Sequence, residues 1–473
     1  MEMTQMLLWI VVILLLSIGE GAPVFAAIGF TAVVTMSMFA GTKFLGSFTT
    51  IAYSQGMNSN QLIVPLFILM AEFLTKGGIA EDIFFVLNKY MKKLKGGLAL
   101  CTIVACTIFA ALCGSSPATA ASVGRIASKE MTKRGYNKGF AIGAIAGGGT
   151  LGIMIPPSVT FVLFGIVTET SIVKLLMAGL LPGIMLAILM CLYIVVRAAM
   201  DPTLVGEEPR PGSRKAKRLA AAAEAAKMAV AQSGETIGEM EAIAAEAKAK
   251  RQEEPKTTLM QDIRLALPSL ILIVIVIGCM YTGIATPTES AGIGVIGALL
   301  IVAFNRRLNK NMFISALRNT TKTATMQIFL AISGMCLSAV ITRAGIATQL
   351  AELIVGAGVN KWVVMSLLFV LWYILGCLMS PGSMIVLTIP FIFETLLTMG
   401  FDPLWIGVVS TLCVEVGMIT PPVGLNLFIL KSSTDVPMTD IIKGALPYVG
   451  VLTLGLIILC LFPDIALWIP SRM

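Results

Sequence analysis

The chain has 473 residues, of which 57% are hydrophobic and only 13% are charged. A soluble protein of this length needs more polar residues to cover its surface, so the composition predicts an all-α polytopic membrane protein. Histidine is absent, which excludes histidine-based acid–base catalysis, Ser–His and Cys–His nucleophile pairs and histidine metal sites. The formal charge of +8 is interpreted as Lys and Arg of cytoplasmic loops, not as a surface for nucleic acid.

The nine cysteines are scattered through apolar runs, and no two form a Cys-x-x-Cys pair. They are interpreted as small lipid-facing or core residues. We therefore expect neither a transition-metal site nor an organic cofactor.

Apolar segments fill most of the chain. The first, residues 6–17, lacks the basic flank and the cleavage site of a signal peptide, so we expect it to remain as a span. The exception is residues 200–262, which are rich in Ala, Glu, Lys and Arg and too polar to cross a bilayer. We interpret them as a charged, helical cytoplasmic linker, with a partner-binding helix as the alternative. The linker separates residues 1–199 from residues 263–473.

Short sequence blocks recur in the same order on both sides of the linker, about 265 residues apart. They are Thr75-Lys76-Gly77-Gly78 with Thr342-Arg343-Ala344-Gly345, Ser116-Pro117 with Ser380-Pro381, Pro156-Pro157 with Pro421-Pro422, and Gly179 and Pro182 with Gly444 and Pro447. The two halves are therefore predicted to be structural repeats.

Charges indicate how the repeats are oriented. Lys129, Lys133, Arg134 and Lys138 follow the first Ser-Pro block, whereas residues 394–403, after the second block, contain no Lys or Arg. By the positive-inside rule only the first of these segments is cytoplasmic, which predicts inverted repeats, a common architecture of secondary transporters. Counting crossings outward from the linker predicts both termini outside the cytoplasm, which is the periplasm if the source is a Gram-negative bacterium.

Each Ser-Pro block interrupts an apolar stretch and predicts a re-entrant helical hairpin, at about residues 98–128 and 364–397. About fifteen residues per arm are too few for two full crossings. Backbone at a tip within the membrane is tolerated where it lines a cavity or binds a ligand. Hydroxyl and carbonyl oxygens suit Na⁺, and the N-termini of half-helices suit a carboxylate. The alternative is an ordinary tight turn.

Each Pro-Pro pair predicts a helix broken near mid-membrane, at about residues 139–167 and 404–430. Consecutive prolines remove N–H donors and force the preceding residue out of the helix, which frees carbonyl oxygens. A purely structural kink is the alternative. Next to a hairpin tip, each break would form the other wall of a cation site.

Charged residues inside apolar runs are candidate functional residues. Arg125 could meet a substrate carboxylate, or else extend toward the cytoplasm or pair with an acid. Glu415 could polarise ligating carbonyls or bind a cation indirectly, and Asn426 is a candidate polar contact. Glu72 and Glu289 are interpreted mainly as helix-packing acids.

Together these residues resemble the large membrane subunit of the TRAP (tripartite ATP-independent periplasmic) transporters. The resemblance covers nearly the whole chain except the linker, which is longer than the family usually carries. It depends on Pro65-Leu66-Phe67, Gly114-Ser115-Ser116, Lys133-Arg134-Gly135-Tyr136, Ile155-Pro156-Pro157-Ser158, Thr286-Pro287-Thr288-Glu289, Thr342-Arg343-Ala344-Gly345-Ile346 and Thr420-Pro421-Pro422-Val423-Gly424-Leu425-Asn426.

The resemblance implies a subunit of the bacterial inner membrane that contacts lipid and works with a small four-helix membrane subunit and a periplasmic substrate-binding protein. It implies Na⁺-driven import of a small carboxylate, such as a C4-dicarboxylate or sialic acid, by an elevator-type movement. The first repeat begins almost at residue 1, so we expect the small subunit to be a separate chain.

The resemblance also implies site residues. The first sodium cluster would comprise Gly114, Ser115, Ser116, Thr119, Gly149, Thr150 and Gly152, and the second Ser380, Gly382, Ser383, Gly417 and Thr420. The substrate would contact Ser116, Pro117, Arg125, Ser380, Pro381 and Asn426.

Two other classes of function remain open. One is a stand-alone ion-coupled carboxylate transporter of a related elevator type. The other is a channel or a membrane enzyme. An enzyme is disfavoured because the sequence has no histidine, no metal-ligand cluster and no nucleophile constellation.

Overall fold

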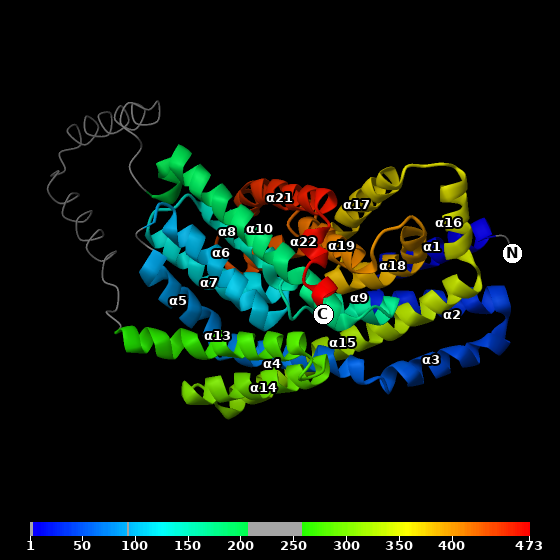
Figure 1. Cartoon of the computed structure of the whole chain (residues 1–473), viewed down its shortest axis with the longest axis horizontal. Coiled ribbons are helices and arrows are strands. Elements are labelled where there is room, and N and C mark those ends of the chain that lie inside the picture. The colour runs from blue at the N-terminus through cyan, green and yellow to red at the C-terminus, as the bar shows by residue number, and fades with distance from the viewer. Residues whose placement is uncertain (1–2, 92–93, 207–257) are drawn as a thin grey trace.

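The computed structural model of the chain describes residues 3–91, 94–206 and 258–473. Helices dominate these ranges and no residue within them lies in a strand, which confirms the prediction of an all-α membrane protein (Figure 1). Most of the predicted linker falls outside the described residues. Its last part, 259–262, belongs to a helix instead, because Thr258 and Gln261 form a capping box that starts the helix ahead of the apolar run.

The first half contains ten α-helices among its described residues. They are α1 (Met3–Gly19), α2 (Val24–Ala40), α3 (Gly46–Gly56), α4 (Ile63–Lys76), α5 (Ile79–Met91), α6 (Gly97–Cys113), α7 (Ser116–Lys133), α8 (Lys138–Thr150), α9 (Val159–Thr168) and α10 (Ile172–Met200). Short 3₁₀ turns join several of them, including η1 (Thr42–Leu45), η2 (Ser59–Leu62), η3 (Leu151–Ile153) and η4 (Pro202–Val205).

The second half follows a matching order. Its helices are α13 (Leu259–Thr282), α14 (Pro287–Phe304), α15 (Lys310–Arg343), α16 (Ile346–Gly356), α17 (Lys361–Leu378), α18 (Pro381–Thr398), α19 (Pro403–Met418), α20 (Leu425–Ser433), α21 (Met438–Leu461) and α22 (Asp464–Leu467), with η5 (Pro470–Arg472) at the end. In the described ranges seven helices are long and apolar enough to cross a membrane, or eight if the bent pair of α3 with η2–α4 is one span.

The two Ser-Pro blocks each separate a pair of helices. The arms α6 and α7 have 17 and 18 residues, and α17 and α18 have 18 each, so they are longer than the fifteen expected. The extra length comes from the outer ends, where α7 continues to Lys133 and α17 begins at Lys361. By length and composition α17 and α18 could each cross a membrane, so their re-entrance stays a prediction.

The two halves interlock reciprocally. In the first half α7 packs on α20 and α8 packs on α21, while in the second half α18 packs on α9 and α19 packs on α10. Each hairpin therefore contacts the broken helix of the other half as well as its own. The exchange has the pattern of a two-fold relation between the halves. Their inversion with respect to the membrane stays a prediction.

Glycines allow this close approach. At the crossing of α8 and α21, a Cβ on Gly143 would collide with the backbone of Gly444, and a Cβ on Gly444 would collide with the backbone of Gly139. Helices in lipid associate through van der Waals packing and small residues, because lipid tails offer no hydrophobic force between them. These glycines thus set how closely the two halves can approach.

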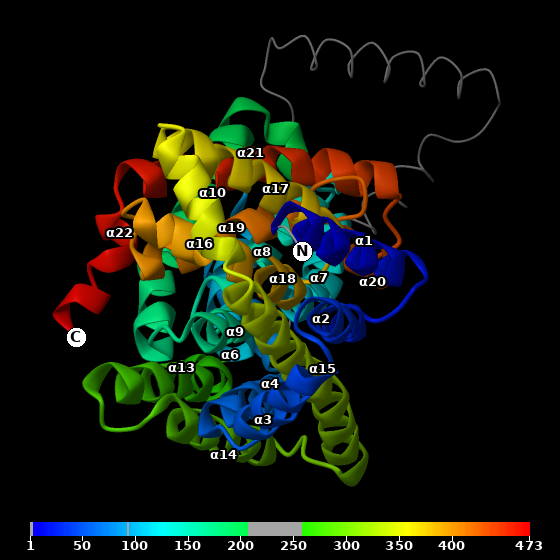
Figure 2. The same cartoon turned by 90° about the vertical axis from the view of Figure 1, so that its right-hand side faces the viewer.

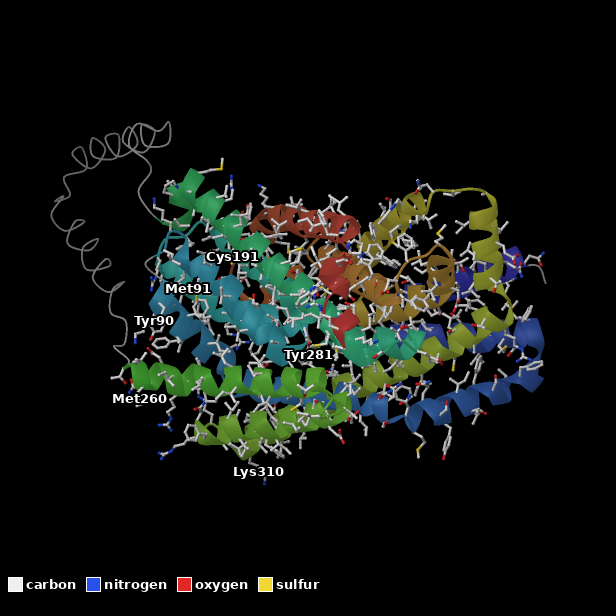
Figure 3. All side chains as sticks on the ribbon, viewed as in Figure 1. Tyr90, Met91, Cys191, Met260, Tyr281 and Lys310 are labelled. Carbon is white, nitrogen blue, oxygen red and sulfur yellow. The ribbon has the colours of Figure 1, made fainter. Side chains whose placement is uncertain are left out.

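The helices are arranged in layers. Both views place α3, α4, α13 and α14 along one edge, with α7, α8, α9, α18 and α19 in the middle and α17 and α21 toward the opposite edge (Figures 1 and 2). On α13, Met260 and Tyr281 are exposed near opposite ends of the helix (Figure 3). Apolar side chains on an outer face are expected where a helix faces lipid.

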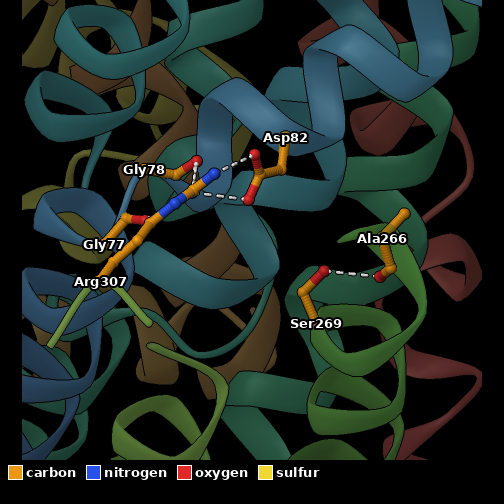
Figure 4. Close-up of polar contacts among 6 residues, drawn as sticks. All are labelled: Gly77, Gly78, Asp82, Ala266, Ser269 and Arg307. Carbon is orange, nitrogen blue, oxygen red and sulfur yellow. Dashed lines mark hydrogen bonds and ion pairs between the residues drawn. The ribbon is translucent and has the colours of Figure 1, made fainter. Parts of the chain in front are cut away.

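Two charge pairs attach α5 to the second half. The Arg307 guanidinium donates to Asp82 Oδ2 at 2.7 Å and Oδ1 at 2.8 Å, and to the carbonyl oxygens of Gly77 and Gly78 at 2.7 and 3.1 Å (Figure 4). At the other end of α5, Lys89 pairs with the buried Asp262 at 2.5 Å. Figure 4 also shows Ser269 donating to the carbonyl of Ala266 within α13.

Arg307→Ala should therefore destabilise the protein. The change leaves Asp82 buried without its bidentate partner and removes the guanidinium donor from the Gly77 carbonyl, and we expect a loss of roughly 1–3 kcal/mol because the guanidinium is partly exposed. Thermal unfolding of the purified protein measures it. Arg306→Ala, next to it in the chain, is the control and should leave the melting temperature unchanged. Equal melting temperatures for both variants would contradict a stabilising role of the Arg307–Asp82 pair.

Candidate functional site

The first hairpin tip packs directly against the first helix break. Gly114 ends α6 with a left-handed φ of 61°, and a Cβ there would collide with the carbonyl oxygen of Pro157. A Cβ on Gly152 would come within 2.6 Å of the Ser115 carbonyl oxygen. Likewise, a Cβ added to Gly149 would lie 2.8 Å from the Cβ of Ala120 in α7. The structure thus brings the predicted glycines of the break against the tip.

Hydroxyl groups line this contact with their hydrogens already used. Thr119 Oγ1 donates to the Ser115 carbonyl at 2.9 Å, and Thr150 Oγ1 donates to the Gly147 carbonyl at 2.6 Å. A hydroxyl has two lone pairs besides its hydrogen. Both threonine oxygens therefore remain able to accept a hydrogen bond or to ligate a cation.

The second tip is built around Ser380 and Ser383. Ser380 is the N-cap of α18; its Oγ accepts the backbone N–H of Ser383 at 3.4 Å, and the two hydroxyl oxygens lie 2.8 Å apart. Gly382 faces away from the second break, because a Cβ there would approach Leu163 of α9 and Gln327 of α15. This tip is therefore seated between α9 of the first half and α15 of the second half.

The second break meets the arm before the tip. A Cβ on Gly417 would come within 2.6 Å of the backbone of Gly376 in α17. The Gly424 N–H donates to the Cys377 carbonyl at 3.0 Å. Thr420 Oγ1 donates to the Val416 carbonyl at 2.5 Å, which leaves its lone pairs open. Gly376 and Cys377 are contacts that the sequence prediction missed; a glycine four positions before the tip was their signal.

A buried hydrogen-bonded triad links the two halves. Asn426 Nδ2 donates to Ser116 Oγ at 2.7 Å, and Ser116 Oγ donates to Glu415 Oε2 at 3.0 Å. All three side chains are 0% exposed. The polar contact expected of Asn426 is therefore one to Ser116. The sequence prediction missed the direct bond between Ser116 and Glu415, and a role of Glu415 toward carbonyls or a cation stays a prediction.

The other predicted substrate residues lie apart from the triad or provide backbone geometry. Pro117 and Pro381 occupy the first turns of α7 and α18, where a missing N–H costs nothing. Arg125 is exposed on α7, nine positions after Ser116, or about 13 Å along the helix axis. Its contact with substrate stays a prediction.

Oxygen atoms dominate the chemistry of these contacts. Hydroxyls and backbone carbonyls are the neutral oxygen ligands that suit a hard monovalent cation. Among the described residues no group of three or more His, Cys, Asp or Glu could hold a metal ion. Hydroxyl and carbonyl oxygens are thus gathered at the tips and breaks, and their binding of Na⁺ stays a prediction.

Polytopic helices with paired hairpins and broken helices around buried polar residues define the class of secondary transporters. The family comparison makes the assignment specific: residues 8–465 match the family model "Tripartite ATP-independent periplasmic transporter, DctM component". The chain belongs to this family, and its relatives are transporter permeases, not enzymes.

Two of its relatives share a name. It is 31% identical to the C4-dicarboxylate TRAP transporter large permease protein DctM of Pseudomonas aeruginosa, over 87% of this chain and 86% of the relative. It is 29% identical to the same-named protein of Vibrio cholerae, over 99% and 98% of the two chains. Among solved structures it resembles the YdaH transporter of Alcanivorax borkumensis, with TM-score 0.59, 14% identity and coverage of 92% and 90%. That likeness concerns the fold alone.

Gly152→Ala should abolish transport. The added methyl group would need the space that the Ser115 and Ser116 backbone occupies, so the tip and the break could not pack as they do. Uptake in proteoliposomes measures the loss. Gly450→Ala on α21 is the matched control, because a Cβ there meets nothing within 4 Å, and it should transport normally. A fully active Gly152→Ala protein would contradict the close contact of tip and break.

Proposed function

We propose that the chain is the translocating subunit of a Na⁺-driven importer of a small carboxylate, which a periplasmic binding protein delivers. The observation that carries the proposal is the packing of each hairpin against helix breaks rich in oxygen ligands. Gly152 against Ser115 and Gly417 against Gly376 are its most direct contacts. The family model and the DctM relatives support transport in general; the driving ion and the cargo are our inference.

Sodium coupling is supported by the state of the hydroxyl groups. Thr119, Thr150 and Thr420 each donate their hydrogen to a nearby carbonyl and keep lone pairs free. Neutral oxygens with no hydrogen to offer favour a cation over an anion. Bound Na⁺ would supply positive charge at the tips, and the residues of the chain would position it there.

A carboxylate substrate is supported by the helix N-termini at the tips. Ser116 begins α7 and Pro381 begins α18, so the unsatisfied N–H groups and the positive dipole end of both helices lie at the turns. Such ends favour negative charge. Named relatives differ in cargo: they are a sialic acid permease of Vibrio cholerae, 27% identical, and an ectoine permease of Halomonas elongata, 29% identical. Selection of the exact cargo is assigned to the binding protein.

Partners and movement follow the same proposal. The complex would include a small four-helix membrane subunit. This chain is 27% identical to the isethionate permease DctMQ of Oleidesulfovibrio alaskensis and covers only 64% of that relative's length. The interlocked elements α6–α9 and α17–α20 would move as one body, since each half holds the other's hairpin. The outer helices α4, α13, α14 and α15 would act as a scaffold in an elevator-type movement.

The orientation proposed is inner membrane with the linker in the cytoplasm. Lys89 contacts Asp262, close to the end of the linker, and Arg307 of the next loop contacts Asp82 on the same helix. These contacts place α5, the linker's end and the Arg306-Arg307 loop together, as expected for one basic, cytoplasmic side. Both termini would then lie in the periplasm.

Ser116→Ala and Ser380→Ala test the proposal. Each removes an oxygen at a tip, and we expect the Na⁺ concentration for half-maximal uptake to rise by about tenfold. The measurement is carboxylate uptake in proteoliposomes with both partner proteins, at varied Na⁺. Ser366→Ala, on the exposed face of α17, is the control. Unchanged Na⁺ dependence in both tip variants would overturn the site assignment.

The alternative of a stand-alone transporter gives a different result in the same vesicles. Uptake that persists when the binding protein is omitted would favour it.

A further inference from the structure

Buried acidic side chains of the described residues fall into two kinds. Asp82 and Asp262 are buried but each pairs with a cation, Arg307 and Lys89 respectively. Glu415 is 0% exposed and its recorded partner is the Ser116 hydroxyl, while its Oε1 has no hydrogen-bond partner. Burying a carboxylate is costly unless a positive charge or a proton balances it. Within the described chain Glu415 is the buried acid whose charge is not balanced by Lys or Arg.

The hydrogen bonds around Glu415 have a fixed direction. Asn426 donates to Ser116 and Ser116 donates to Glu415, so the serine hydrogen is fully used. Most of what remains is acceptor capacity: Glu415 Oε1, Asn426 Oδ1, which is also buried without a partner, and one lone pair of Ser116, beside the second N–H of the Asn426 amide. A buried cluster in which three open acceptors, one of them on a carboxylate, outnumber the single spare N–H of Asn426 suits a cation.

The position of the triad agrees with this chemistry. Its members come from α7, α19 and α20, hence from both halves of the chain. Ser116 lies against Gly152 of the first break, and Glu415 lies two positions before Gly417 of the second. The triad thus stands between the two contacts of tip and break where Na⁺ ligands are proposed.

We propose that Glu415 is the fixed negative charge that balances a bound monovalent cation, with Ser116 and Asn426 holding its carboxylate toward the cation. The inference rests on the proposed Na⁺ coupling and deepens it. A single carboxylate among neutral oxygens matches one positive charge, whereas a divalent ion such as Ca²⁺ takes more carboxylates. Uncharged ligands alone would leave Na⁺ in a low-dielectric site without a counter-charge.

Exchanging the carboxylate and the amide between positions 415 and 426 distinguishes the effect of the negative charge from the effect of side-chain size. In Glu415→Gln, the amide would offer Ser116 a second donor and no charge. In Asn426→Asp, the serine would lose its donor and a second carboxylate would be buried. In the double variant Glu415→Gln with Asn426→Asp, residue 415 donates to Ser116 and Ser116 donates to residue 426. The hydrogen-bond chain is then reversed with the net charge conserved and the side-chain sizes nearly unchanged.

The readout is Na⁺-dependent thermal stabilisation of the purified complex, with NaCl exchanged for choline chloride at constant ionic strength. For Glu415→Gln we expect the Na⁺ concentration of half-maximal stabilisation to rise roughly tenfold or more. The double variant should return to within about threefold of the wild type. Glu394→Gln, an exposed acid on α18, is the control and should match the wild type.

The outcomes separate the two proposals. A wild-type complex that Na⁺ does not stabilise would overturn the proposed Na⁺ coupling itself. A wild type and a Glu415→Gln variant that respond equally to Na⁺ would overturn only the role of Glu415. If Glu415→Gln does not fold, the double variant carries the test: recovery of the Na⁺ response supports the charge role, and a folded double variant without any response overturns it. If both proteins respond equally to Na⁺ while the melting temperature shifts with pH in the wild type and not in Glu415→Gln, the balancing charge is a proton on Glu415 instead.

Discussion

The structure depends on the contact of each hairpin with helix breaks from both halves of the chain. Its polar centre is the Ser116 hydroxyl, which receives a hydrogen bond from Asn426, 310 positions away, and gives one to Glu415, 299 positions away. In lipid, backbone and polar groups must find partners inside the protein. A tip and a break satisfy each other's groups only when they are packed together, so neither half could present a complete site alone.

Close backbone approach makes this exchange possible. Gly152 against Ser115, Gly417 against Gly376 and Gly143 against Gly444 are all positions where an added Cβ would meet backbone atoms. Backbone atoms cannot rotate aside as a flexible side chain does, so these positions leave no room for a side chain.

Much of this arrangement follows from local sequence. The apolar runs, the interruptions at Ser116-Pro117 and Pro421-Pro422, and the order of elements all depend on composition and on the φ restriction of proline, which act within a few residues. The helix ends were less predictable, as the longer α7 and α17 show, because polar residues can extend a helix beyond the apolar run. Partners across the halves, such as Glu415 and Asn426 for Ser116, depend on packing and leave no local signal.

The two halves share the order and backbone geometry of their helices, but not their charge pairs. At corresponding turns Gly78 and Gly345 both adopt a left-handed φ, of 73° and 65°. Yet the first turn is clamped by Arg307 to Asp82, whereas beside the second the Arg343 guanidinium lies 3.9 Å from the centre of the Phe44 ring. The backbone geometry is shared because the corresponding helices of both halves are joined by the same kind of tight turn. The charge pairs differ because the residues that face the two turns are not repeated: Arg307 meets Asp82 at the first, and Phe44 meets Arg343 at the second.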